Sequence, residues 1–148
     1  MDIMRQTAFH LQQIIERSED RLLCFTEAES QSRRPSVKWS RKEVLGHLID
    51  SASNNHQRFV RSQLQGALVF PGYAQDGWNR VQQYQSETWE NLVRLWTSYN
   101  RHLAHVIAAI PESAARNVCT IGDSKPVTLQ FLVTDYVSHL EHHLGQIL

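Results

Sequence analysis

The chain has 148 residues, 41% of them hydrophobic, and equal numbers of basic and acidic residues, 15 of each. This length suits a single domain over residues 1–148, and the balanced charge argues against binding to a nucleic-acid backbone. No apolar run reaches the length of a membrane span, and two cysteines without a CxxC motif favour a reducing compartment, so we expect a cytoplasmic protein.

Four segments show apolar residues at the spacing of an amphipathic helix. In chain order they cover about residues 2–28, 40–64, 86–110 and 128–148. Ser40 followed by Glu43 has the spacing of a capping box, which marks the start of the second segment. Long connections at about residues 67–85 and 111–127 separate the later segments, and we expect them to hold additional structure or to line a site. The stretch TIGDSKPVT predicts a small turn or hairpin.

The pattern of four amphipathic helices in one domain predicts an all-α fold. We therefore expect an antiparallel four-helix bundle with long connections. Periodicity does not fix the order in which the helices pack.

The last helix carries an unusual density of histidines, in the stretch HLEHHLGQIL. With Leu140 at the centre of the apolar face and about 100° per residue, His143 lies near −60° and His139 near −100°. His142 lies near −160°, on the solvent side. His139 and His143 therefore form a pair one turn apart at the edge of the buried face, and His142 points outward.

Two imidazoles separated by four residues can direct nitrogens at one metal ion, but a third ligand must come from another helix. The second helix offers His47 and His56 on opposite faces. His47 shares a polar strip with Arg58 and its neighbours beside the apolar face. Such a strip suits a buried site between helices, and it equally suits a helix edge at the surface. The residues alone leave both interpretations open.

Three stretches together resemble one known family. They are KWSRKEVLGHLIDSASNNHQRF, PGYAQDGW in the middle connection, and DYVSHLEHHLGQI at the end. Their order and spacing resemble the DinB/YfiT-like superfamily of bacterial proteins over essentially the whole chain. The family fold is an antiparallel four-helix bundle with a long connection. This chain departs from the pattern only at its end, which is short.

The resemblance implies a divalent-metal site, with nickel or zinc as the expected ion. Matched residue by residue, the ligands are His47, His139 and His143. Some relatives are thiol-dependent transferases, many are described as metal-dependent hydrolases, and some are homodimers. A homodimer is therefore an expectation here too.

Five further residues are candidates for supporting such a site: Asp50, Arg58, Trp78, Asp135 and Gln146. Asp135 and Asp50 could orient ligand imidazoles, or they could be solvated helix carboxylates. Arg58 could receive an anionic substrate, or form a surface ion pair. Trp78 could help cover a pocket, or merely attach its loop to the bundle, and Gln146 could line the site or an edge.

The resulting hypothesis is a metal-dependent hydrolase or thiol transferase that acts on a small molecule. The alternative is a bundle without catalysis, either a metal-binding module or a structural homodimer.

Overall fold

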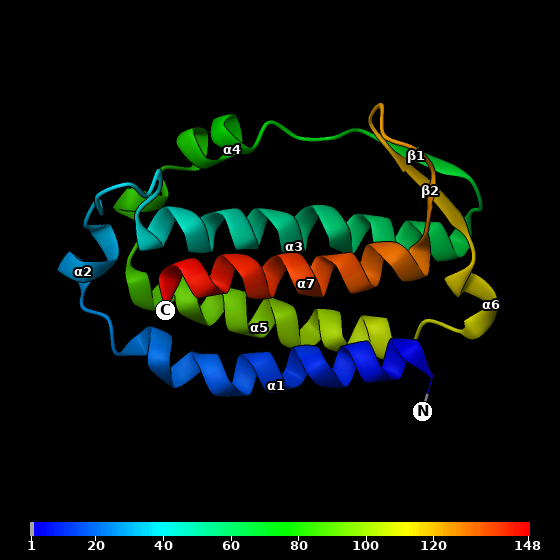
Figure 1. Cartoon of the computed structure of the whole chain (residues 1–148), viewed down its shortest axis with the longest axis horizontal. Helices are drawn as coiled ribbons and strands as arrows, with labels where there is room; N and C mark the ends of the chain where they lie inside the picture. The colour runs from blue at the N-terminus through cyan, green and yellow to red at the C-terminus, as the bar shows by residue number, and fades with distance from the viewer. Residues whose placement is uncertain (1) are drawn as a thin grey trace.

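Four long helices lie side by side in the computed structural model, which describes residues 2–148 (Figure 1). The predicted four-helix bundle is confirmed. Its helices are α1 (Ile3–Leu23), α3 (Arg41–Leu64), α5 (Trp89–Ala108) and α7 (Leu129–Ile147). Short elements occupy the connections: α2 (Glu27–Gln31), β1 (Leu68–Phe70), α4 (Gln75–Gln82), the 3-10 turn η1 (Tyr84–Ser86), α6 (Glu112–Ala115), β2 (Val118–Ile121) and β3 (Val127–Thr128).

The helix starts follow local capping chemistry. At Ser40 both halves of the predicted capping box are present, with Glu43 and Ser40 each bonded to the other's backbone N–H. The prediction of one helix to residue 28 is wrong, because α1 ends at Leu23 and α2 begins after it. Thr26 and Glu29 form a second capping box. This box starts a new helix where periodicity alone indicates continuation.

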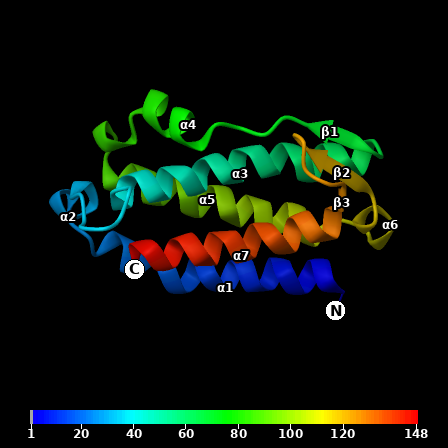
Figure 2. The ribbon, with the colours of Figure 1, turned by 45° about the horizontal axis from the view of Figure 1, so that its top comes forward.

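The neighbouring helices are not all antiparallel. The colours of Figures 1 and 2 show that α3 and α5 run in the same direction, opposite to α1 and α7. The cause is the long connection after α3, which returns along the bundle through β1 and α4 before α5 begins. As a result α3 and α7 are antiparallel neighbours, and the returning connection runs along α3.

The chain is not strictly all-α, because the two long connections meet in a small sheet at one end of the bundle (Figure 1). β1 pairs with β2 in parallel, with Val69 opposite Thr120. β2 pairs with β3 in the predicted hairpin, with Cys119 opposite Val127. These short strands lack a repeating pattern long enough to be recognised in the sequence.

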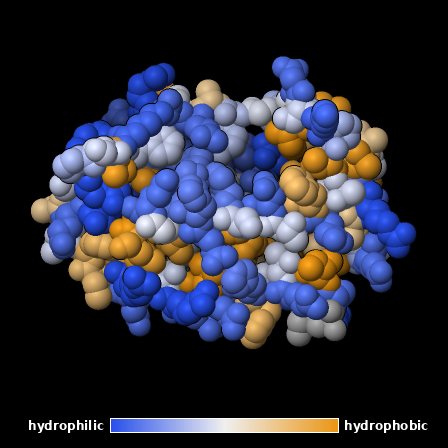
Figure 3. All heavy atoms as spheres, viewed as in Figure 1, coloured by the Kyte–Doolittle hydropathy of each residue, from blue (hydrophilic) through white to orange (hydrophobic). Residues whose placement is uncertain are grey.

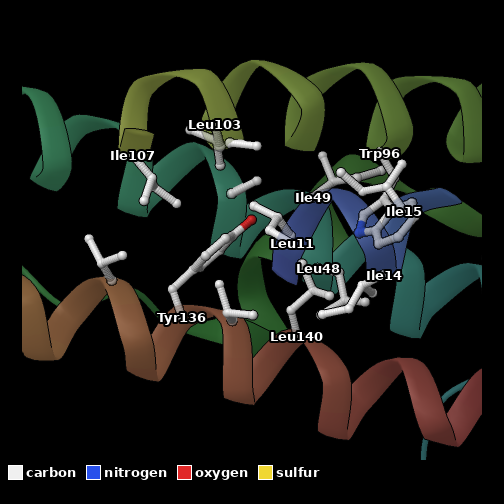
Figure 4. Close-up of a cluster of buried hydrophobic side chains, with 14 of the residues drawn as sticks. Leu11, Ile14, Ile15, Leu48, Ile49, Trp96, Leu103, Ile107, Tyr136 and Leu140 are labelled. Carbon is white, nitrogen blue, oxygen red and sulfur yellow. The ribbon is translucent and has the colours of Figure 1, made fainter. Parts of the chain in front are cut away.

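One hydrophobic core fills the bundle, with side chains from all four long helices (Figure 4). Trp96 of α5 lies completely buried at its centre. The hydroxyl of Tyr136 on α7 donates to Oδ1 of Asn100 on α5 at 2.5 Å, which satisfies a polar pair inside this core. None of the described helices is long and apolar enough to cross a membrane.

The returning connection is seated on α3 through Gly46, which lies directly under the ring of Tyr84. A Cβ atom at Gly46 would overlap this ring. We therefore expect Gly46→Ala to destabilise the fold by about 1–3 kcal/mol, because the buried ring has to move. Gly145 of α7 has open space around it. Gly145→Ala should instead stabilise by about 0.5–1 kcal/mol. Urea denaturation of both variants checks this, and equal effects would contradict it.

Candidate metal centre

Three imidazoles meet between α3 and α7. His47 comes from α3, and His139 and His143 come from successive turns of α7. One ring nitrogen from each lies within 4.8 Å of the others. The ring centroids are 5.3 Å apart for His47 and His139, and 4.8 Å for His47 and His143. Among residues 2–148, this is the group of His, Cys, Asp and Glu side chains arranged closely enough to hold a metal ion.

His47 lies deeply buried beneath this group, with 1% of its surface exposed. Neither of its ring nitrogens has a hydrogen-bond partner in the described chain. A buried imidazole without partners is costly, since each nitrogen has lost its water. Trp39 covers its outer side, with ring centroids 5.1 Å apart. His47 therefore keeps a nitrogen lone pair that is shielded from water and lies close to two further imidazoles.

The electrostatics of the group favour neutral imidazoles. Burial, together with the neighbouring His143 and His139, lowers the pKa of His47 to about 4, whereas Asp76 opposes the shift. Burial also lowers the pKa of His139, with His143 acting in the same direction and Asp135 opposing it. Neutral imidazole is the form that donates a lone pair to a cation.

The predicted split of the terminal histidines agrees with the structure. His143 is half-buried, and its Nδ1 is hydrogen-bonded to Oε1 of Gln146 at 2.9 Å. Since the amide oxygen accepts, Nδ1 carries the proton and Nε2 keeps its lone pair. Gln146 is therefore a positioning residue for this ring. His142 is exposed and lies outside the group of three, although its ring centroid is 5.2 Å from that of His143.

The two carboxylates suggested as partners of the histidines do not bond to them. Asp50 is buried and accepts hydrogen bonds from Tyr84 Oη at 2.6 Å and Gln82 Nε2 at 2.8 Å. Burial raises the pKa of Asp50, and those two hydrogen bonds oppose the shift. Asp135 is exposed and makes no hydrogen bond to His139 within residues 2–148. Asp50 therefore anchors the returning connection to α3.

Two cavities adjoin the imidazoles, one on each side. The larger, of about 690 Å³, is lined by Trp39, Asp76, His143 and Gln146 among others. The smaller, of about 290 Å³, is lined by His139 and by polar residues of α3 and α7, including Arg58. Figure 3 shows that the face crossed by the returning connection is hollowed beside the sheet. Trp78 lines neither of these two cavities, but its ring packs on Tyr73, which lines the smaller one.

Comparison with known proteins identifies the family. The family model described as the DinB superfamily matches residues 10–147. This chain belongs to the DinB superfamily. Among solved structures it is similar to YfiT from Bacillus subtilis, with a TM-score of 0.82 and 18% sequence identity, covering 95% of this chain and 83% of YfiT. YfiT is described as a probable metal-dependent hydrolase with an unusual four-helix bundle topology. A search of curated proteins gave no significant match.

Sequence reasoning missed one contributor to the site of this DinB-superfamily protein. Trp39 packs on His47 although it lies before α3. Asp76 of α4 lies in the connection that was expected to line a site, and it forms an ion pair with Lys38 at 2.7 Å beside the larger cavity. Both residues belong to stretches that carry the family resemblance. The role of Asp76 depends on the returning connection lying over α3, which no local pattern indicates.

Proposed function

We propose that His47, His139 and His143 bind one divalent metal ion. The observation that carries this proposal is His47, a buried imidazole whose two nitrogens lack partners beside two other imidazoles. A cation held by the three imidazoles would satisfy one of these two nitrogens. Three nitrogen donors suit zinc or nickel, the ions that we propose.

The protein's own residues give this site an open side. Three ligands leave further coordination positions free, and the bound ion would supply Lewis-acid polarisation of an oxygen or sulfur atom. Gln146 fixes the His143 ring, and Trp39 shields His47 from water. The larger cavity, lined by His143, has the size of a small-molecule pocket.

We infer that the reaction is metal-dependent hydrolysis of a small molecule. The open ligand set and the adjoining cavities support a catalytic rather than a purely structural ion. The description of the structurally similar YfiT as a probable metal-dependent hydrolase supports the same class. Thiol transfer and metal binding without catalysis are the competing outcomes of the test below.

A panel of small esters, amides and phosphoesters tests this function. With zinc or nickel bound, we expect turnover that falls by about 100-fold or more after chelation and returns when the ion is restored. His143→Ala should lack it, and His142→Ala should retain it because His142 is exposed. Turnover that survives chelation would contradict the proposal. Turnover only with an added low-molecular-weight thiol would indicate thiol transfer, and metal binding without any turnover would indicate a non-catalytic site.

A further inference from the structure

The smaller cavity contains an arginine in an unusual environment. Arg58 of α3 is the one buried arginine within residues 2–148, with 8% of its surface exposed. Other arginines of the bundle have carboxylate partners, such as Arg94 with Glu90 and Arg101 with Glu19. Arg58 forms no ion pair in the described chain, and its Nη1 donates a long hydrogen bond of 3.4 Å to Oδ1 of Asn55.

A guanidinium that is largely removed from bulk water and has no counter-charge is unfavourable, because no anion compensates the hydration that it has lost. Burial lowers the pKa of Arg58, which reflects this cost, and the nearby Tyr73 and Cys119 oppose the shift. Arginine nonetheless stays protonated in proteins. The positive charge therefore remains, and an anion entering the cavity would compensate it.

The rest of the cavity favours an anion at this end. Tyr73 lines it, and burial together with the charge of Asp50 raises the pKa of this phenol to about 12, so its hydroxyl keeps a proton to donate. Lys125, in the turn between β2 and β3, adds a second cation. The carboxylate in the lining is Asp135, an exposed residue one turn from His139. Asp50 acts on Tyr73 through its charge, but it lies outside the lining and accepts hydrogen bonds from Tyr84 and Gln82.

The cavity also connects this arginine with the three imidazoles. On α3 it follows Ser51, Asn55 and Arg58, and on α7 it runs from Leu132 to His139. Ser51 lies one turn after His47, and Arg58 lies two turns beyond Ser51, about 10 Å at 1.5 Å per residue. A molecule with its anionic group at Arg58 would thus reach Ser51, about two helical turns away and one turn from His47, where His139 also lines the cavity.

We propose that the smaller cavity is an oxyanion subsite, in which the Arg58 guanidinium binds a carboxylate or phosphate group of the substrate in bidentate fashion while the rest of the molecule reaches His139. The planar fork of arginine matches both oxyanions. The assignment of this anion to a substrate rests on the proposed metal-dependent function. The binding of the anion itself does not require the metal.

The first experiment uses chelator-treated protein, so that failure of the metal site does not affect it. Succinate and inorganic phosphate are titrated at constant ionic strength, with NMR detection of the Arg58 side-chain N–H groups and the backbone of residues 51–58. We expect saturable shifts with at least one of the two anions, and the comparison distinguishes carboxylate from phosphate. Shifts that stay linear with both anions, as for ionic-strength effects, would overturn the subsite.

Three variants sharpen this test. Arg58→Gln should weaken anion binding by about tenfold or more, and Arg58→Lys should restore it only in part because lysine lacks the fork. Arg61→Gln is the matched control, since Arg61 is an exposed arginine one turn along the same helix. Equal loss in Arg61→Gln, or undiminished binding in Arg58→Gln, would overturn the proposal. If Arg58→Gln does not fold, the anion affinity of Arg58→Lys and the shifts of the wild-type Arg58 resonances still test the proposal.

A second experiment links the subsite to the metal. The zinc-loaded protein is titrated with a hydroxamate joined by a flexible alkyl chain to a carboxylate, and with the methyl ester of the same compound. The free carboxylate should bind about tenfold more tightly than the ester in the wild type, and this advantage should vanish in Arg58→Gln. If the acid and the ester bind with equal affinity, the anion site is not part of the substrate-binding site. This conclusion would hold even if the first experiment shows that the anion binds.

Discussion

His47→Ala should abolish stoichiometric binding of zinc and nickel. The wild type is expected to bind about one ion per chain, and the variant less than about 0.1, because two imidazoles of one exposed helix edge hold a cation poorly. His139→Ala and His143→Ala should behave similarly, since each removes one of three donors that lie within 4.8 Å. Elemental analysis of protein produced without a purification tag measures this directly.

The same variants should lose the stabilisation that the ion provides. At a free metal concentration of about 1,000 times Kd, the wild type should gain about 4 kcal/mol by mass action. The melting temperature of the metal-free variants should therefore not respond to added zinc or nickel. His142→Ala is the matched control, an exposed histidine beside His143, and it should keep both the ion and the response. A loss of binding in His142→Ala equal to that in His143→Ala would contradict the assignment.

The metal-free protein should lose stability as the pH falls from about 6.5 to about 4. His47 has an ordinary pKa of 6.5 in the unfolded chain, and burial lowers this pKa to about 4 in the folded chain. Between these values the unfolded chain binds a proton that the folded chain does not, so unfolding becomes easier as the pH falls. The contribution of His47 is full above pH 6.5, and its loss amounts to as much as about 3 kcal/mol at pH 4.

Urea denaturation of chelator-treated protein at several pH values measures this effect. His47→Gln cannot titrate, so its stability should fall less steeply across the same window. The raised pKa of Asp50 acts in the opposite direction, but it is common to both proteins and cancels in the comparison. His142→Gln should retain the wild-type slope because that ring is exposed. Identical slopes in the wild type and His47→Gln would show that His47 is not a buried neutral base.

The four long helices could be predicted because each buries an apolar stripe with the period of a helix. The pairing of His139 and His143 was predictable for the same reason, since an angle on one helix fixes which side chains share a face. The position of Gln146 on the same side of the helix was predicted from the same angles. The residues by themselves left His47 and His56 as alternatives on α3, and the family resemblance favoured His47. In the structure Nδ1 of His56 is hydrogen-bonded to the hydroxyl of Tyr99 at 2.9 Å, and its ring packs against His102 rather than in the group of three histidines.

The features that could not be predicted depend on contacts between distant segments. Parallel pairing of β1 with β2 joins residues about 50 positions apart, and each strand is too short for a recognisable alternation. The shared direction of α3 and α5 follows from the path of the returning connection. That path places Tyr84 against α3 and also closes the cavities. The burial of Arg58 could therefore not be predicted from its place in the polar strip.

X-ray absorption at the zinc edge of the reconstituted wild-type protein tests the central assignment most directly. We predict a first shell that contains three imidazole nitrogens at about 2.0–2.1 Å, together with oxygen donors in the open positions. The multiple scattering of imidazole distinguishes these donors from carboxylates. A first shell with sulfur, or with fewer than three imidazoles, would contradict the account.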